Sequence, residues 1–269
     1  MLRKVMATLL ALVLVLAASL TCAQAESYTI GFAVSTLENP FFVTMKDAAV
    51  AKAAELGVDL VVLDAQDSAE TQASQVEDFI TRGVDLLIIN PVDSDAIGTS
   101  VMACNEANIP VITVTRASNA GTVVQHLDID NKEAGRLDAE QLLKDLDGKG
   151  KVAILEGIAG SSSAIEREEG FVDALKGSEV EVVTSLTANY SREEGATVTE
   201  DILQSNPELD AIYAHNDEMA LGAVRAVAAA GRSAEIKIYG IDATDDALVA
   251  VENGEMAATV QQQPDLQIE

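Results

Sequence analysis

The sequence lacks tryptophan and contains only two cysteines, two histidines and few basic residues. Lys and Arg number 17 against 44 Asp and Glu, which gives a formal charge of −27. An acidic surface of this kind repels nucleic acid and anionic lipid, so the composition argues against a nucleic-acid role. Aromatic residues make up only 3% of the chain, so the core must be mainly aliphatic, as in parallel sheets covered by Ala-rich helices.

The scarce cysteines and histidines also limit the chemistry. Cys104 is the only cysteine after residue 25, which excludes an internal disulfide in that part, and it is predicted to pack inside a helix. His126 and His215 do not have the paired spacing of metal ligands. We therefore expect no metal site and no cofactor.

Residues 1–25 have the pattern of a signal peptide. Two basic residues precede an apolar run that is short for a membrane span, and a small-x-small sequence ends at Ala25. We expect cleavage after Ala25 and export to the periplasm or the extracellular face. A lipoprotein anchored through Cys22 is less favoured, because Ser-Leu-Thr before it is a poor lipidation sequence. No second long apolar run follows, so the mature protein is expected to be soluble.

After residue 25, short apolar strands alternate with amphipathic helices. The first series of strands is predicted at Tyr28–Val34, Leu60–Leu63, Leu86–Ile89 and Val111–Val114, with helices starting near Pro40, Ser68 and Ser94. The second series is predicted at Val123–Ile129, Val152–Leu155, Val180–Leu186, Ala211–Ala214 and Ile236–Ile241, with helices starting near Asn131, Ser163, Arg192, Asp217 and Thr244. Such alternation indicates parallel sheets with right-handed crossovers, and nine or ten strands favour two sheets.

The fold class is therefore α/β, with two doubly wound parallel-sheet lobes. The first series ends near Ile129 or Asp130, where no low-complexity linker occurs, so we expect a hinge of crossing strands there. We assign residues 26–129 to an N-terminal lobe, to which residues 263–269 return. Residues 130–262 form the C-terminal lobe.

The stretch V-S-T-L-E-N-P-F-F, at 34–42, joins the first strand to the first helix. Asn39 is a suitable N-cap and Pro40 fits the first helical position. Two adjacent aromatic residues follow, and only one ring can easily face the core. We expect the other to lie over the carboxyl ends of the strands, where open α/β sheets bind ligands. The alternative is that both rings belong to the core.

Polar or aromatic side chains follow most of the predicted strands. Arg, Asn, Asp and Gln offer paired donors and acceptors that match vicinal hydroxyls, while aromatic faces match the C–H faces of a sugar ring. One such residue is usually only a cap, but several together predict a polar small-molecule cleft between the lobes. The candidates at the strand ends are Ser35, Asn39, Phe41, Phe42, Thr115, Arg116, Arg167, Tyr190, Asn216 and Asp242.

An enzymatic reading has less support. The sequence from Gly157 to Ser161 resembles a phosphate loop but lacks the Lys-Ser/Thr ending and the third glycine of a dinucleotide fingerprint, so we interpret it as a tight turn. No G-x-S-x-G elbow occurs. His215 could serve as a base beside Asp217, but Asp217 is better explained as the cap of the next helix. We therefore expect that the protein is not an enzyme.

The chain resembles the periplasmic ribose-binding proteins of bacterial ABC transporters, in the type I sugar-binding superfamily. The likeness extends from Tyr28 to Pro264. It rests on V-S-T-L-E-N-P-F-F at 34–42, I-N-P-V-D-S-D-A at 89–96, A-N-I-P-V-I-T at 107–113, G-I-A-G at 157–160, R-E-E-G-F at 167–171, N-D-E-M-A-L-G-A at 216–223, G-I-D at 240–242 and A-A-T at 257–259.

The resemblance implies a monomeric exported protein that captures ribose or a related monosaccharide or polyol between two lobes joined by a three-strand hinge. It would deliver the sugar to an ABC transporter permease. The aromatic residues of the ring sandwich correspond to Phe41, Phe42 and Tyr190. The residues that bind the hydroxyls correspond to Ser35, Asn39, Arg116, Arg167, Asn216, Asp242 and Gln262.

Two departures from the family pattern stand out. Ribose binders carry Asp immediately before the arginine that corresponds to Arg116, whereas this chain has Thr115, which leaves another pentose, a hexose or a polyol open. Family members also continue with another helix that packs on the first lobe. This chain ends at Glu269, so it looks truncated, and we expect apolar surface on that lobe.

Two other binding functions share the expected architecture. A sensor of sugars or quorum signals that presents its ligand to a chemoreceptor is the first alternative. The sugar-sensing domain of lac-repressor-type regulators is the second, and the export signal and the absence of a basic helix-turn-helix segment count against it.

Overall fold

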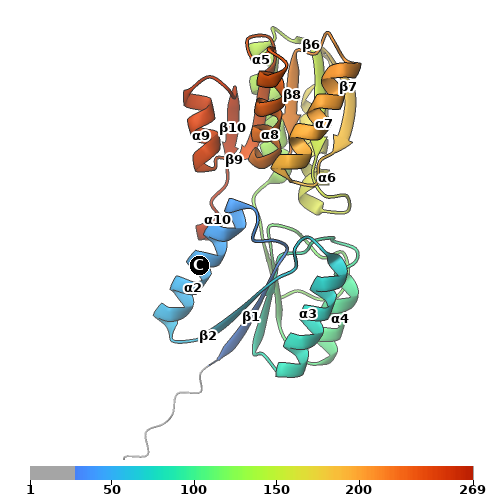
Figure 1. The fold of residues 1–269 in the computed structure, drawn as a ribbon. Coiled ribbons are helices and arrows are strands. Elements are labelled where there is room, and N and C mark those ends of the chain that lie inside the picture. The colour runs from blue at the N-terminus through green and yellow to red at the C-terminus, as the bar shows by residue number, and fades with distance from the viewer. Residues whose placement is uncertain (1–27, 269) are drawn as a thin grey trace, which may run out of the picture.

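The computed structural model describes residues 28–268, so the predicted signal peptide, the cleavage site at Ala25 and Cys22 lie outside the described residues. The described strands form two five-stranded sheets, and all their pairings are parallel. Figure 1 shows the two sheets as separate lobes, one above the other. We call them the N-terminal and C-terminal lobes. This is the predicted α/β architecture.

The N-terminal lobe is built on a sheet of order β2-β1-β3-β4-β5. Its strands are β1 (Thr29–Val34), β2 (Asp59–Asp64), β3 (Leu86–Ile89), β4 (Val111–Val114) and β5 (Gln125–Leu127). Its helices are α2 (Pro40–Leu56), α3 (Ala69–Arg82) and α4 (Gly98–Glu106), with the short α10 (Pro264–Ile268) beside α2 (Figure 1).

The C-terminal lobe is built on a sheet of order β10-β9-β8-β6-β7. Its strands are β6 (Lys149–Glu156), β7 (Glu179–Thr187), β8 (Ala211–Ala214), β9 (Lys237–Asp242) and β10 (Ala258–Gln261). Its helices are α5 (Asn131–Asp145), α6 (Ser162–Ala174), α7 (Arg192–Ser205), α8 (Asp217–Ala229) and α9 (Asp245–Glu252). Counted from the first strand of each lobe, both sheets have the order 2-1-3-4-5, in which ligands bind at the point where the order reverses.

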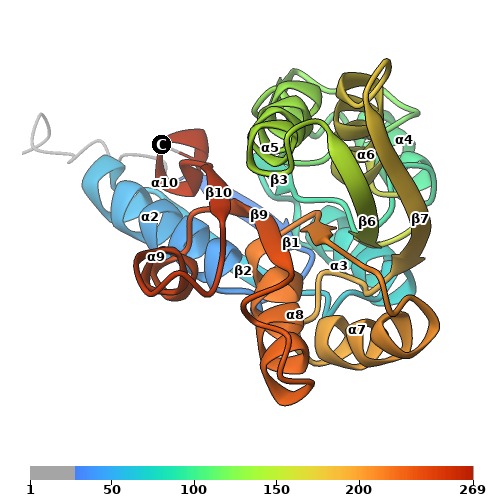
Figure 2. The same ribbon diagram turned by 90° about the horizontal axis from the view of Figure 1, so that it is seen from above.

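Helices cover both faces of each sheet, as the buried strands require. In β6, Val152 and Ile154 pack toward α5 and α6, whereas Ala153 and Leu155 pack toward α7 and α8, because successive side chains of a strand point to opposite faces. Figure 2 shows α5 and α6 on one side of this sheet and α7 and α8 on the other. Cys104 is a free thiol in the N-terminal core, and burial raises its pKa to about 11.

Two helix pairs in the C-terminal lobe meet at glycines. A Cβ atom on Gly135 of α5 would lie 2.1 Å from the Arg167 carbonyl oxygen, and one on Gly170 of α6 would lie 2.0 Å from the Lys132 carbonyl oxygen. Between α7 and α8, a Cβ on Gly222 would lie 2.2 Å from the Arg192 carbonyl oxygen. The absence of side chains therefore allows the backbones to come into direct contact.

The chain passes between the lobes twice within residues 28–268. The first crossing joins β5 to α5 near Asp130, and the second joins β10 to α10, which lies against α2. The predicted boundary near Ile129 or Asp130 falls at the first crossing. Two crossings of the predicted hinge are thus among the described residues.

The structure corrects the prediction at three elements. The strand predicted at Val123–Ile129, in the second series, is the three-residue β5, and it pairs with β4 of the first sheet. Strand β10 was not predicted, because it is a short edge strand with few apolar residues. Helix α4 begins at Gly98 and not near Ser94, because the Asp93 carboxylate accepts from the amides of residues 95 and 96 and holds a turn there.

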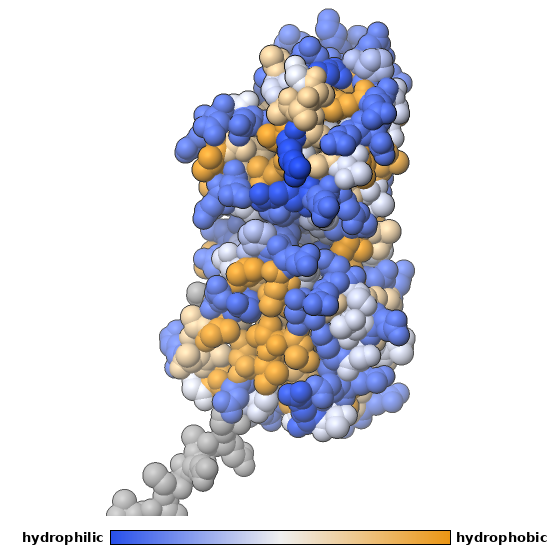
Figure 3. All heavy atoms as spheres, in the orientation of Figure 1, coloured by the Kyte–Doolittle hydropathy of each residue, from blue (hydrophilic) through white to orange (hydrophobic). Residues whose placement is uncertain are grey.

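One face of the N-terminal sheet is only partly covered. The helix α2 and the short α10 lie on it, and an apolar groove of about 270 Å³ remains beside them. Its walls include Ile30, Ala53, Leu56, Leu60 and Ile88. Figure 3 shows the hydrophobic residues gathered on this lobe. The apolar surface expected on the first lobe is therefore present.

Candidate ligand-binding cleft

A small cavity lies between the carboxyl ends of the strands of the two lobes, and the side chains that line it are buried. Its volume is about 20 Å³, on the order of one or two water molecules. Ten of the eleven predicted site residues line it, together with one residue that was not predicted, Ser163. The complete lining is Asn39, Phe41, Phe42, Thr115, Arg116, Ser163, Arg167, Tyr190, Asn216, Asp242 and Gln262.

Ser35 is the predicted residue that does not line this cavity. It is fully buried at the end of β1, where its backbone amide donates to Asn90 Oδ1 and its carbonyl accepts from the Asp67 amide. Its hydroxyl oxygen has no hydrogen-bond partner among the described residues. Ser35 thus lies at the predicted strand end, but beside the cavity and not in its wall.

Helix α2 brings its first turn to the cavity. Asn39 caps the helix, because its Oδ1 accepts from the Phe41 amide at 2.9 Å, and its side-chain NH2 group remains as a donor. Phe41 and Phe42 meet edge to face, with centroids 5.1 Å apart and an interplanar angle of 86°. Both rings are buried in the core cluster and both line the cavity, so the expected division between a core ring and a ligand ring does not hold.

Arg116 reaches across from the end of β4. Its guanidinium carbon lies 5.5 Å from the centroid of Phe42 and 5.0 Å from that of Tyr190, so the cation contacts an aromatic ring of each lobe. Nη1 donates to the Pro91 carbonyl at 3.0 Å, while Nε has no partner among the described residues. Burial lowers the pKa of this guanidinium, and the nearby Tyr190 opposes that effect.

Arg167 is the second buried guanidinium, and it projects from α6. Its Nε donates to Asn131 Oδ1 at 2.9 Å and its Nη1 to the His215 carbonyl at 2.6 Å. These bonds tie α6 to the start of α5 and to the end of β8, so the group is fixed on three elements. Arginine presents five N–H donors, and the donors not used in these two bonds are available to a ligand.

Asp242 and Gln262 form the acceptor wall at the ends of β9 and β10. Gln262 Nε2 donates to Asp242 Oδ1 at 2.6 Å, and Gln262 Oε1 has no partner among the described residues. Burial raises the pKa of Asp242 to about 8, Arg167 opposes the rise, and Asp217 adds to it. The wall therefore offers oxygen acceptors to hydroxyl donors.

Asn216 caps helix α8. Its Oδ1 accepts from the Met219 amide at 3.0 Å, which corrects the prediction that Asp217 is the cap. Asp217 instead lies in the first turn, where its carboxylate accepts from the Thr244 amide and from the Thr259 hydroxyl. Burial lowers the pKa of His215, the candidate base, to about 3, and the nearby Arg167 guanidinium lowers it further, so the imidazole is neutral at physiological pH. A neutral, buried imidazole that accepts from the Gly157 amide is a structural group.

Tyr190 closes the C-terminal side. Its hydroxyl forms a hydrogen bond with Ser163 Oγ at 2.9 Å, so a protein group already engages it. A Cβ on Gly157 would lie 2.1 Å from the ring, so the glycine leaves the space in which the ring sits. Ser163 was missed because it belongs to a run of three serines at a helix start, and the sequence does not indicate which of them faces the cavity.

Direct hydrogen bonds join the two lobes beside the cavity. The Ser94 amide of the N-terminal lobe donates to the Gly160 carbonyl at 3.1 Å, and Ser94 Oγ accepts from the Ser162 amide at 3.2 Å. Ser162 Oγ accepts from the Ala117 amide at 2.9 Å. The lobes are therefore in contact around the cavity, which is the arrangement that encloses it.

Strained turns surround the site. Positive φ angles follow four strands, at Asp67 (54°), Thr115 (65°), Tyr190 (60°) and Asp242 (133°). Non-glycine residues adopt such angles at a cost of the order of 1–3 kcal/mol, and they are often clustered at functional sites. Thr115 is the least favourable of them, because it is β-branched.

The groups that line the cavity are aromatic rings, guanidinium groups, amides, hydroxyls and one carboxyl group. Its lining includes no histidine or cysteine. Within residues 28–268, no cluster of three or more His, Cys, Asp or Glu side chains could hold a metal ion. No helix in that part of the chain is long and apolar enough to cross a membrane.

The sequence matches known proteins over nearly its whole length. The family model described as a periplasmic binding protein domain matches residues 30–269. The chain is 48% identical over 238 residues to the ribose import binding protein RbsB of Haemophilus influenzae, which covers 88% of this chain and 81% of that protein. It is 43% identical over 262 residues to RbsB of Escherichia coli K12, with 97% of this chain and 88% of that protein covered.

The fold is also similar to those of solved sugar- and polyol-binding proteins. The Caulobacter myo-inositol binding protein, bound to myo-inositol, gives a TM-score of 0.87 at 37% identity over 92% of this chain and 86% of that chain. An ABC transporter solute binding protein from Actinobacillus succinogenes, with bound D-allose, gives a TM-score of 0.83 at 33% identity over 90% of this chain and 88% of that chain. The chain therefore belongs to the periplasmic binding protein family.

Proposed function

We propose that the protein is the sugar-binding component of an ABC importer. It captures ribose or a related monosaccharide or polyol between the lobes, against the residues that line the interlobe cavity, and delivers it to a membrane permease. Because the cavity itself has room for only one or two water molecules, the lobes must separate to admit a sugar ring. The observation that carries this proposal is the cavity itself, where aromatic rings, two guanidinium groups and an Asp–Gln acceptor wall converge from both lobes. Such a set matches a ring with several hydroxyls. The ribose, myo-inositol and D-allose binders among the similar proteins support the same class of ligand.

The proposed mechanism is closure of the two lobes on the sugar. Residues 26–129 with 263–269 form one body and residues 130–262 the other, and the crossings between them act as the hinge. Each lobe supplies part of the hydrogen-bond set, so only the closed form satisfies all of it. The permease then distinguishes closed from open molecules. No bond of the ligand is broken in this scheme.

The same proposal includes the cellular location of the protein and its binding partners. The protein acts as a monomer after export to the periplasm or the outer face of the cell, and its partners are the sugar and the permease. Presentation of the sugar to a chemoreceptor is compatible with the same closed form. Loss of sugar uptake in cells that lack the protein would distinguish an importer component from a sensor.

A thermal melt against a panel of pentoses, hexoses and polyols tests the proposal. A ligand at a hundred times its Kd stabilises the native state by about 2.7 kcal/mol. We expect a clear rise in Tm with at least one monosaccharide or polyol. A cooperative melt that no member of the panel shifts would overturn the sugar assignment and leave the fold unaffected.

Thr115→Asp is expected to raise the affinity for ribose. The residue lines the cavity, and a carboxylate at this position can accept a charge-assisted hydrogen bond from a ring hydroxyl. Such a bond contributes about 1.5–3 kcal/mol, which corresponds to a Kd about 10-fold to 150-fold lower. Calorimetric titration of wild type and variant with ribose measures the change.

Thr115→Asn is the matched control. Asn tolerates the positive φ of this position as Asp does, but its amide carries no charge. Both variants should therefore gain stability from relief of the β-branched strain, and only the Asp variant should gain the larger increase in affinity. An unchanged Kd for Thr115→Asp would show that the side chain does not contact the ligand.

Sugar binding is expected to strengthen as the pH rises from 6 to 8. Burial raises the pKa of Asp242 to about 8, so below that pH most molecules carry a neutral carboxyl group there. Ring hydroxyls donate more strongly to a carboxylate, and each pH unit below the pKa costs up to about 1.4 kcal/mol to ionise it. The Kd should fall up to tenfold per unit and level off above pH 8.

Asp242→Asn provides the comparison for this pH dependence. The amide cannot ionise, so the variant should bind more weakly at pH 8 and show a flat profile between pH 6 and 8. Titrations at constant ionic strength measure both profiles. A flat profile in the wild-type protein would mean that Asp242 binds the ligand without changing its protonation state.

A further inference from the structure

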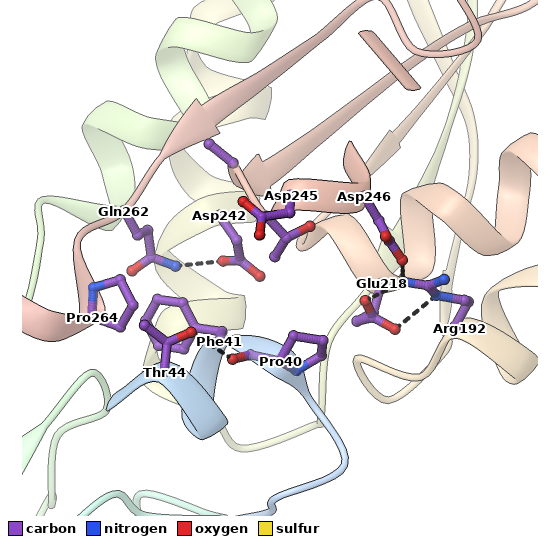
Figure 4. A pocket seen from close by; sticks show the side chains of 12 residues that line it. Pro40, Phe41, Thr44, Arg192, Glu218, Asp242, Asp245, Asp246, Gln262 and Pro264 are labelled. Atoms are coloured by element: carbon purple, nitrogen blue, oxygen red, sulfur yellow. Dashed lines mark hydrogen bonds and ion pairs between the residues drawn. The ribbon is translucent and has the colours of Figure 1, made fainter. Parts of the chain in front are cut away.

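A second, larger hollow adjoins the enclosed cavity. Its volume is about 390 Å³, and Phe41, Asp242 and Gln262 line both spaces. Figure 4 shows it between the start of α2 in the N-terminal lobe and the turns around Asp242 and Asp245 in the C-terminal lobe. The three shared residues lie between the two spaces, so a substituent on a ring that is bound against them would extend into this hollow.

Acidic side chains dominate the walls of this hollow. Glu218, Asp242, Asp245 and Asp246 line it, together with a single guanidinium, that of Arg192. Arg192 is already paired: Nε and Nη2 donate to the two Glu218 oxygens at 2.8 and 2.7 Å, and Nη2 also donates to Asp246 at 2.9 Å. No other lysine or arginine lines the space. The hollow therefore has an excess of negative charge.

Unpaired acceptors at the boundary between the two spaces give a second indication. Gln262 is 5% exposed, and its Oε1 has no partner among the described residues. Asp242 is 6% exposed, and its only side-chain hydrogen bond in the described chain is the one from Gln262 to Oδ1. Figure 4 shows its other oxygen directed toward the hollow. Buried acceptors of this kind need a donor, and the protein supplies none.

We propose that this hollow is a second subsite, which accepts a positively charged amino substituent on the bound ring. The ligand class is then an amino-substituted sugar or amino-polyol. This inference rests on the proposed sugar-binding function and extends it to the ligand's substituent. An ammonium group has three donors for the unpaired oxygens, whereas a hydroxyl group has only one.

The acidic walls also act at longer range. Asp245 lies in the first turn of α9, and no hydrogen bond or ion pair of its carboxylate occurs within residues 28–268. Its charge is therefore not compensated locally, and it attracts a cation in the hollow. Because the hollow is open to solvent, added salt should weaken this attraction.

Matched pairs of ligands test the subsite. The wild-type protein is titrated calorimetrically with D-ribose and its amino-deoxy derivatives, and with scyllo-inositol and amino-deoxy-scyllo-inositol. At least one amino ligand should bind about tenfold or more tightly than its hydroxyl counterpart, and 0.5 M NaCl should reduce that ratio. Asp245→Asn should reduce the ratio as well. Glu252→Gln removes a charge from the other end of α9, outside the hollow, and should leave the ratio unchanged.

The outcomes separate this inference from the proposed function. If neutral ligands bind and no amino ligand is preferred, the subsite is overturned and the sugar-binding function stands. If neither member of any pair binds, the amino subsite is overturned, and the thermal melts against the full panel of pentoses, hexoses and polyols decide the sugar-binding function separately. A preference that persists in Asp245→Asn and in high salt would also overturn the acidic subsite, because the selectivity would then come from another group.

Discussion

Arg167→Met is expected to weaken sugar binding by at least a hundredfold. Methionine keeps much of the volume of the arginine side chain but removes all five of its N–H donors from the cavity wall. Two charge-assisted hydrogen bonds to ligand hydroxyls contribute about 1.5–3 kcal/mol each, so their loss corresponds to roughly a hundredfold to ten-thousandfold in Kd. Loss of the bonds to Asn131 and His215 should also loosen the site, which acts in the same direction.

Calorimetry with the sugar selected from the panel, together with a chemical melt, checks this expectation. The free energy of unfolding should change far less than the free energy of binding, because the substitution also removes a desolvated charge from the interior. Arg136→Met is the control: this arginine lies on the exposed face of α5 and pairs with Glu133 and Glu140. Wild-type affinity in Arg167→Met would remove Arg167 from the site.

Gly170→Ala is expected to destabilise the protein by about 3 kcal/mol. In an ordinary helix the change from glycine to alanine is favourable by about 1 kcal/mol. A loss of stability would therefore show that the contact between the helices, and not helix propensity, determines the effect. Here the new methyl group would lie 2.0 Å from the Lys132 carbonyl oxygen, and the backbones of α5 and α6 would have to separate. Overpacking of this kind costs about 1–3 kcal/mol or more.

Denaturant unfolding measures this effect, and Gly177→Ala serves as the control. Gly177 has a φ of 86° but nothing lies within 4 Å of a Cβ there, so its substitution should cost only about 1–2 kcal/mol of backbone strain. The separation of α5 from α6 would also pull Asn131 away from Arg167, so weaker sugar binding should accompany the lost stability. A neutral or stabilising Gly170→Ala would show that the two helices can shift freely.

The alternation of apolar runs and helical patterns predicted most of the fold. Strands such as β3 and β4 are short continuous apolar segments, and both have the predicted bounds. The edge strands were harder, because β5 is exposed throughout and β10 is partly exposed, so neither has an apolar pattern. Pairing with a neighbouring strand defines these elements, and a single sequence does not contain that information.

The candidate site was predicted to the level of strand ends but not of side-chain direction. A residue at the end of a strand lies at the correct edge of the sheet, which is why ten predicted residues surround one cavity. Ser163 lines the cavity and Ser35 does not. The backbone conformation at each strand end decides which side chain faces the cavity, and the sequence does not indicate that conformation. Asn216 and Asp217 are both good helix caps, and only the bond to the Met219 amide distinguishes them.

The shared strand order of the two lobes brings topologically related strand ends to the two sides of the cleft. The turn after β4 supplies Arg116, and the corresponding strand of the other lobe, β9, ends at Asp242. Topologically related strand ends therefore present a cation from one lobe and an acceptor from the other. A sugar ring is not symmetric, so turning it end for end would change which hydroxyls meet Arg116 and which meet Asp242. The two lobes thus share one strand order, but they offer different groups to the ligand, so we expect the sugar to bind in one orientation. Epimers of the same size present their hydroxyls differently to these groups, and the cleft can distinguish them.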